Sequence, residues 1–106
     1  MGGDPLDQML QQIVGQIVDT VDPDKIILFG SRSRRCEDPD SDYDLLVLKS
    51  GIQSRRAVAH QIYRALVDIP AAVDVLVETP ERLEQHQSAT DVVYREALQG
   101  MVVYER

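Results

Sequence analysis

The segment 42–48, DYDLLVL, restricts the fold of this chain most, because it is apolar at consecutive positions after its acidic start. Neighbouring residues of a strand point to opposite faces of a sheet, so an apolar run of this kind needs cover on both faces. It predicts a central strand whose acidic end reaches the rim of the sheet. Such a strand needs further strands beside it and helices packed on the sheet.

Apolar spacing and turn residues place the other elements along the chain. Apolar residues at three- and four-residue spacing predict a leading amphipathic helix, which Asp22-Pro23-Asp24 ends. Pro70 is expected to end a second helix, and Thr79-Pro80 to begin a third. The expected helices are 6–21, 54–68, 80–85 and 91–99, with a helical turn at 31–36 and a loop at 37–41. The expected strands are 25–30, 42–48, 71–77 and 101–104.

Length and composition favour one compact domain. A chain of 106 residues buries about 65% of its extended surface on folding, which is enough for a real core. Hydrophobic residues make up 43% of the chain and aromatic residues 5%, so aliphatic side chains must form that core. No repeat, low-complexity tract or linker divides the sequence. We therefore expect a single domain over residues 1–106, of the α/β (α+β) class, with helices packed on a mixed sheet.

Charge and cysteine content exclude several classes of protein. The net charge is −7, which repels phosphate except where arginine is concentrated, so direct non-specific binding of nucleic acid is not expected. Cys36 is the only cysteine, which excludes an intramolecular disulfide and zinc sites built on paired cysteines. The acidic start lacks the features of a signal peptide, and no apolar run approaches the ~20 residues that span a bilayer. A cytoplasmic protein without a membrane anchor is the expectation.

Paired aspartates stand at the acidic start of the predicted central strand. Because side chains alternate along a strand, Asp42 and Asp44 are expected on the same face, about 7 Å apart. Two carboxylates held that close repel each other unless a hard cation neutralises both. Magnesium binds one or two carboxylates and leaves positions open for phosphate oxygens. If the strand 71–77 lies beside this one, Asp74 joins the pair, and three carboxylates can hold two metal ions across a transferring phosphoryl group.

The turn that precedes these aspartates is suited to phosphate binding. Gly30 allows a close approach of the backbone, and Ser31 with the following N–H groups can cradle phosphates. Arginines at positions 32, 34 and 35 offer charge to a leaving pyrophosphate, with Arg32 nearest the Gly-Ser turn. Simpler interpretations stay open. In these interpretations the paired aspartates only begin the strand in contact with solvent, Asp74 reaches water, and Ser31 only caps a helical turn.

This spacing resembles the minimal nucleotidyltransferase family of the DNA polymerase β-like superfamily. The pattern of that family is Gly-Ser, ten residues and Asp-x-Asp, with a later Asp on a neighbouring strand. The chain matches it residue by residue, with Gly30-Ser31, the ten residues 32–41, Asp42-Tyr43-Asp44 and Asp74. The resemblance covers nearly the whole chain, because the leading helix and the closing segment GMVVYE also look like those of the family. One residue departs from it, since many members have Gly where this chain has Arg35.

The resemblance implies a small nucleotidyltransferase fold and a transferase activity. In such a protein a nucleoside monophosphate, usually AMP from ATP, is transferred to an acceptor hydroxyl and pyrophosphate is released. The implied catalytic and metal-binding residues are Asp42, Asp44 and Asp74, which hold two Mg²⁺ ions. The first two bind both ions, and Asp74 binds the ion on the nucleophile side and helps to deprotonate the acceptor. Residues Gly30, Ser31 and Arg32 are implied to bind the nucleotide.

The resemblance also implies a partner protein. Small members of the family are similar to antitoxins that act with a helical HEPN ribonuclease and nucleotidylate one of its tyrosines, so a homo- or hetero-oligomer is compatible with it. Two other functions stay open at this point. One is a binding module of the same fold that has lost turnover and occludes its partner. The other is transfer to the hydroxyl of a small molecule such as an antibiotic.

Overall fold

A computed structural model describes residues 8–29, 43–85 and 99–106 of the chain. The described helices are α1 (Gln8–Val21), α2 (Arg55–Ala65) and α3 (Pro80–Gln85). The described strands are β1 (Lys25–Phe29), β2 (Tyr43–Leu48), β3 (Val73–Glu78) and β4 (Met101–Glu105). The expected turn and loop over 31–41, and positions 91–98 of the expected fourth helix, lie outside the described residues.

The four strands form one mixed sheet in the order β3-β2-β1-β4, which confirms the predicted fold class. Strand β1 pairs antiparallel with both β2 and β4, whereas β2 and β3 are parallel. Parallel neighbours need a crossover between them, and α2 provides it. The segment that is apolar on both faces is therefore an inner strand, as predicted, and β3 lies at one edge of the sheet.

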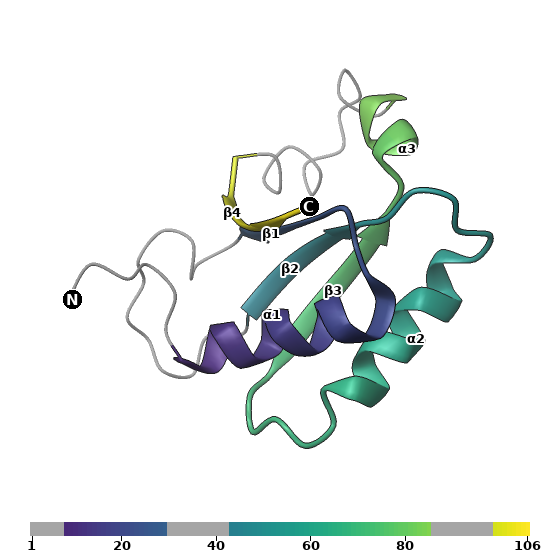
Figure 1. The fold of residues 1–106 in the computed structure, drawn as a ribbon. Helices are drawn as coiled ribbons and strands as arrows, with labels where there is room; N and C mark the ends of the chain where they lie inside the picture. The colour runs from purple at the N-terminus through teal and green to yellow at the C-terminus, as the bar shows by residue number, and fades with distance from the viewer. Residues whose placement is uncertain (1–7, 30–42, 86–98) are drawn as a thin grey trace.

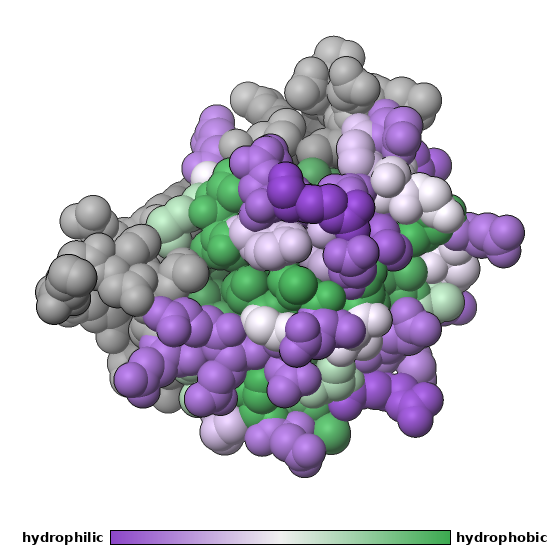
Figure 2. Space-filling model, viewed as in Figure 1, coloured by the Kyte–Doolittle hydropathy of each residue, from purple (hydrophilic) through white to green (hydrophobic). Residues whose placement is uncertain are grey.

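Helices α1 and α2 lie side by side on one face of the sheet (Figure 1). Their apolar sides and the facing residues of the strands form the main core, which is aliphatic apart from tyrosine. Fully buried members include Ile13 and Ile17 of α1, Ile26 of β1, Leu45 of β2 and Ile62 of α2. In Figure 2, viewed from this side, hydrophobic side chains gather toward the middle, and hydrophilic ones lie around them, mainly at the right and below. No helix among the described residues is both long and apolar enough to cross a membrane.

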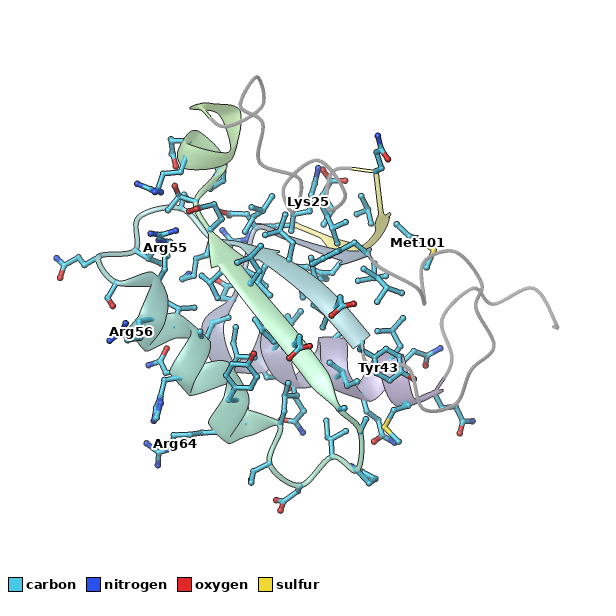
Figure 3. All side chains as sticks on the ribbon, turned by 180° about the vertical axis from the view of Figure 1, so that it is seen from behind. Lys25, Tyr43, Arg55, Arg56, Arg64 and Met101 are labelled. Carbon is cyan, nitrogen blue, oxygen red and sulfur yellow. The ribbon has the colours of Figure 1, made fainter. Side chains whose placement is uncertain are left out.

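The opposite face of the sheet carries a smaller apolar cluster. Figure 3 shows this face, with β2 and β3 in front and both α1 and α2 behind the sheet. The cluster joins Ile27 of β1 to Leu46 and Leu48 of β2, with Phe29 and Leu76 packed against it. We call this side of the sheet the open face, because α1 and α2 lie on the other side, although the three residues of its cluster are buried. Each strand thus sends alternate residues to the helices and to the open face.

The bounds of three elements differ from the sequence prediction, namely those of α2, those of β3 and the end of β4, which is Glu105 and not residue 104. Helix α2 ends at Ala65, not at residue 68, and Leu66 leaves the helical conformation with a ψ of 4°. The residues that follow form tighter turns, in which the N–H of Val67 donates to the Arg64 carbonyl and that of Ile69 to the Leu66 carbonyl, each three residues back. Strand β3 runs over Val73–Glu78 and therefore starts two residues later than predicted and ends one residue later. Helix α3 begins as predicted, since the N–H of Arg82 donates to the hydroxyl of Thr79 at 3.1 Å.

Two glycines in different surroundings give opposite predictions for stability. A Cβ added at Gly15 of α1 meets no atom within 4 Å, whereas one at Gly100 overlaps the carbonyl oxygen of Leu28 in β1. We expect Gly15→Ala to raise the free energy of unfolding by about 1 kcal/mol, because alanine is the better helix former. We expect Gly100→Ala to lower it by about 2 kcal/mol, because β4 must shift away from β1. Urea unfolding of both variants measures the two changes. A change of the same sign in both variants would contradict the close packing of Gly100 against β1.

Candidate active site

Two aspartates meet on neighbouring strands at the open face of the sheet. In the parallel pairing of β2 with β3, Asp44 and Asp74 are direct partners in register. Strands pair about 4.8 Å apart, and partners in register project from the same face. Asp44 lies two residues before Leu46 and Asp74 two before Leu76, so both project to the open face. The sequence prediction that the third strand lies beside the second is confirmed.

Buried neighbours on the opposite face hold Asp44 in this orientation. On β2 the side chains before and after Asp44 are Tyr43 and Leu45, which are 4% and 0% exposed and belong to the core beneath the helices. On β3 the neighbours of Asp74, Val73 and Val75, pack against the same core. A slip of either strand by one residue would bring an aspartate into that core and is therefore strongly disfavoured.

The two aspartates differ in their access to solvent. Asp44 is half-buried on the inner strand, where Phe29 of β1 is its partner on the other side. Asp74 is exposed, because β3 is an edge strand. Asp74 therefore reaches water, as the simpler interpretation of the sequence expected. Its carboxylate is accessible to an incoming molecule from the edge of the sheet.

The two carboxylates are ligands of the kind that a magnesium ion binds. Two like charges on adjacent strands repel each other, and a divalent cation between them relieves that repulsion. Carboxylate oxygens are the ligands that magnesium prefers, and it takes one or two of them from the protein while substrate and water complete the shell. Within the described part of the chain no group of three or more potential ligands gathers at one place. The other predicted site residues, Gly30, Ser31, Arg32 and Asp42, lie outside that part.

A second charged cluster, which sequence analysis missed, lies at the other end of β3. The side chain of Glu78 is fully buried, and its carboxylate accepts hydrogen bonds from Arg55 of α2 at 2.9 and 3.0 Å. Arg82 of α3 donates to the same carboxylate at 3.1 Å. In Figure 3, Arg55 lies near the arrowhead of β3, whereas Tyr43 lies near the opposite end of the sheet. The cluster therefore joins three elements away from the aspartate pair, and the spacing of four residues between Glu78 and Arg82 was its only sequence signal.

Comparison with protein families identifies the chain. Residues 11–106 match the model of the family described as polymerase beta, nucleotidyltransferase, which is most of the chain. The chain belongs to this nucleotidyltransferase family. Its helices packed on a mixed sheet agree with the small nucleotidyltransferase fold that the resemblance implied. Curated proteins, in contrast, give no match.

Solved structures share the fold of this nucleotidyltransferase. A toxin–antitoxin crystal structure with AMP-PNP is 24% identical, with a TM-score of 0.60 over 91% of this chain and 73% of that one. Two mutant forms of the toxin–antitoxin MntA-HpeT are 23% and 24% identical, with TM-scores of 0.58 and 0.55. They cover the same 91% of this chain and 72% and 71% of theirs. At this level of identity the likeness concerns the fold.

Proposed function

We propose that this chain is a Mg²⁺-dependent nucleotidyltransferase that transfers a nucleoside monophosphate, AMP from ATP, to an acceptor hydroxyl and releases pyrophosphate. The observation that carries the proposal is the pairing in register of Asp44 with Asp74 on the open face. Family membership supports the class of reaction. The carboxylate pair supplies what a phosphoryl transfer needs from a protein, namely fixed negative oxygens that hold cations against phosphate.

Each site residue has a role in this proposal. Asp42 and Asp44 would hold both Mg²⁺ ions, and Asp74 would bind the ion on the nucleophile side and help to deprotonate the acceptor hydroxyl. When bound, the cations neutralise the charge on the phosphates and lower the pKa of the attacking hydroxyl. Gly30, Ser31 and Arg32 bind the phosphates of the nucleotide. The exposed position of Asp74 suits this role, because an acceptor can approach it from the sheet edge.

We further propose that the acceptor is a tyrosine of a helical HEPN-type toxin, so that the chain acts as an antitoxin in the cytoplasm. The support comes from the named neighbours in fold, which are toxin–antitoxin structures, one of them with AMP-PNP. A hydroxyl carried by another protein can reach the exposed edge at Asp74. Modification of that hydroxyl adds a negatively charged group to the partner, which is a chemically simple way to change its activity.

A labelling experiment tests the proposed transfer. The chain is isolated from its source cells together with the protein that binds it, and the complex is incubated with Mg²⁺ and ATP labelled at the α- or the γ-phosphate. We expect α-label on a tyrosine of the partner and no γ-label, because AMP is transferred and pyrophosphate leaves. Label from the γ-phosphate would contradict the reaction. A tightly bound partner that stays unlabelled would instead indicate a binding module that occludes its partner.

A further inference from the structure

The outer edge of β3 has backbone groups that no strand of the described sheet satisfies. The N–H of Tyr43 donates to the carbonyl of Ala72, and the N–H of Lys49 donates to that of Glu78. Backbone groups alternate in direction along a strand, so the even-numbered residues of β3 face β2. The N–H and C=O groups of Val75, the residue after Asp74, therefore point away from β2.

Tyr63 of α2 binds both of these outward groups of Val75. The N–H of Val75 donates to the tyrosine hydroxyl oxygen at 2.8 Å, and the hydroxyl is 3.5 Å from the Val75 carbonyl oxygen, to which it donates a weaker bond. Other residues of α2, such as Val58 and Ile62, pack into the core beneath the sheet. The tyrosine, 44% exposed, extends from this helix to the strand edge. The hydroxyl takes the place of a missing neighbouring strand.

The bond acts on the peptide group that joins Asp74 to Val75. Asp74 is the second residue of β3, and strand ends open more readily than strand centres. Its side chain projects to the open face, whereas Tyr63 reaches Val75 from the side of the helices, so the hydroxyl affects Asp74 through the backbone. A cation shared between two strands needs its ligands held to within about 0.5 Å. The contact at Val75 limits how far Asp74 can move from Asp44.

We propose that Tyr63 is a positioning residue for the metal site, which it supports by holding the edge strand at Asp74. This inference rests on the proposed function, since it takes Asp74 to be a metal ligand. It goes beyond that function by assigning a role to a side chain that no part of the nucleotidyltransferase motif includes. The tyrosine also occupies the middle of the outer edge of β3, where none of the described strands pairs, and so hinders pairing of another strand beside Asp74.

The test compares Tyr63→Phe with the wild-type chain and with Tyr104→Phe, which removes a hydroxyl from β4 at the opposite edge of the sheet. Mn²⁺ serves as the probe, and electron paramagnetic resonance of the free ion measures its affinity well below the unfolding temperature. Amide hydrogen exchange of Val75 is followed by NMR on the same samples. We expect Tyr63→Phe to increase exchange at Val75 and to weaken Mn²⁺ binding about fivefold, the effect of one lost hydrogen bond. Tyr104→Phe should leave both unchanged.

The possible results separate this inference from the proposed function. If Tyr63→Phe speeds exchange at Val75 but binds Mn²⁺ as tightly as the wild type, the tyrosine only stabilises the strand and the inference is wrong. If exchange at Val75 is unchanged, the contact with Val75 does not hold the strand, and the inference is wrong for that reason. If the wild-type chain itself fails to bind Mn²⁺, the proposed function is wrong, and the role of Tyr63 that rests on it is wrong as well.

Discussion

Replacing Asp74 by asparagine is expected to reduce nucleotidyl transfer at least about a hundredfold, while the metal-free chain becomes slightly more stable. The loss follows because one metal ligand and the group that accepts the acceptor proton disappear together. Each of them lowers the activation free energy of the transfer by kilocalories. The gain follows because Asp74 and Asp44 are partners in register, and like charges placed directly opposite each other destabilise a sheet by about 0.2–1 kcal/mol. Asp44→Asn should also reduce transfer strongly, because it removes a ligand that both metal ions share.

The matched control for this prediction is Asp19→Asn, which makes the same change of charge at an exposed position of α1. Transfer is measured with α-labelled ATP, and stability by urea unfolding in the presence of a chelator. Asp19→Asn should keep full activity. A drop in stability that accompanies the loss of activity in Asp74→Asn would mean that the aspartate is needed for folding. Full activity of Asp74→Asn would remove it from the site.

The buried glutamate gives the largest expected effect on stability. Replacing both Arg55 and Arg82 by alanine is expected to lower the free energy of unfolding by about 3 kcal/mol, because the fully buried carboxylate of Glu78 loses two guanidinium partners. Glu78→Gln should cost less, about 1 kcal/mol, since both arginines are about half exposed and their charges return to water.

Addition of Glu78→Gln to the double arginine variant separates burial of charge from loss of packing. The triple variant should be more stable than the double variant, because no buried charge is left without its guanidinium partners. Urea unfolding of the wild type and the three variants measures these differences. A Glu78→Gln variant less stable than the double arginine variant would contradict this account of the cluster.

Much of the fold could be predicted because short-range patterns decide it. The apolar spacing of α1, the Thr79-Pro80 start of α3 and the apolar run of β2 all depend on neighbours in the chain, and each element is found where it was expected. The inner position of β2 also followed from sequence, since both of its faces are apolar. The end of α2 was placed too late because its apolar residues continue past the residue that leaves the helix.

The site could be predicted only in part, because its surroundings depend on strand order. That Asp74 would lie beside the strand of Asp44 was inferred correctly, but its exposure follows from the edge position of β3, which no local pattern shows. The contacts of Glu78 and of Tyr63 join consecutive elements, α2 with β3 and β3 with α3, and depend on how these elements pack against each other. Single residues of ordinary type carry no signal for such contacts. Binding of the nucleotide phosphates by the Gly-Ser turn stays a prediction, because Gly30, Ser31 and Arg32 lie outside the described residues.

The most direct test of the metal site is a crystal structure of the chain soaked with Mn²⁺ and a non-hydrolysable ATP analogue, with anomalous diffraction to locate the manganese. We expect two anomalous peaks at coordination distance, about 2.1 Å, from carboxylate oxygens of Asp42 and Asp44, with Asp74 also bound to one of them and phosphate oxygens completing the coordination. Manganese bound elsewhere, with these carboxylates far from the phosphates, would contradict this prediction.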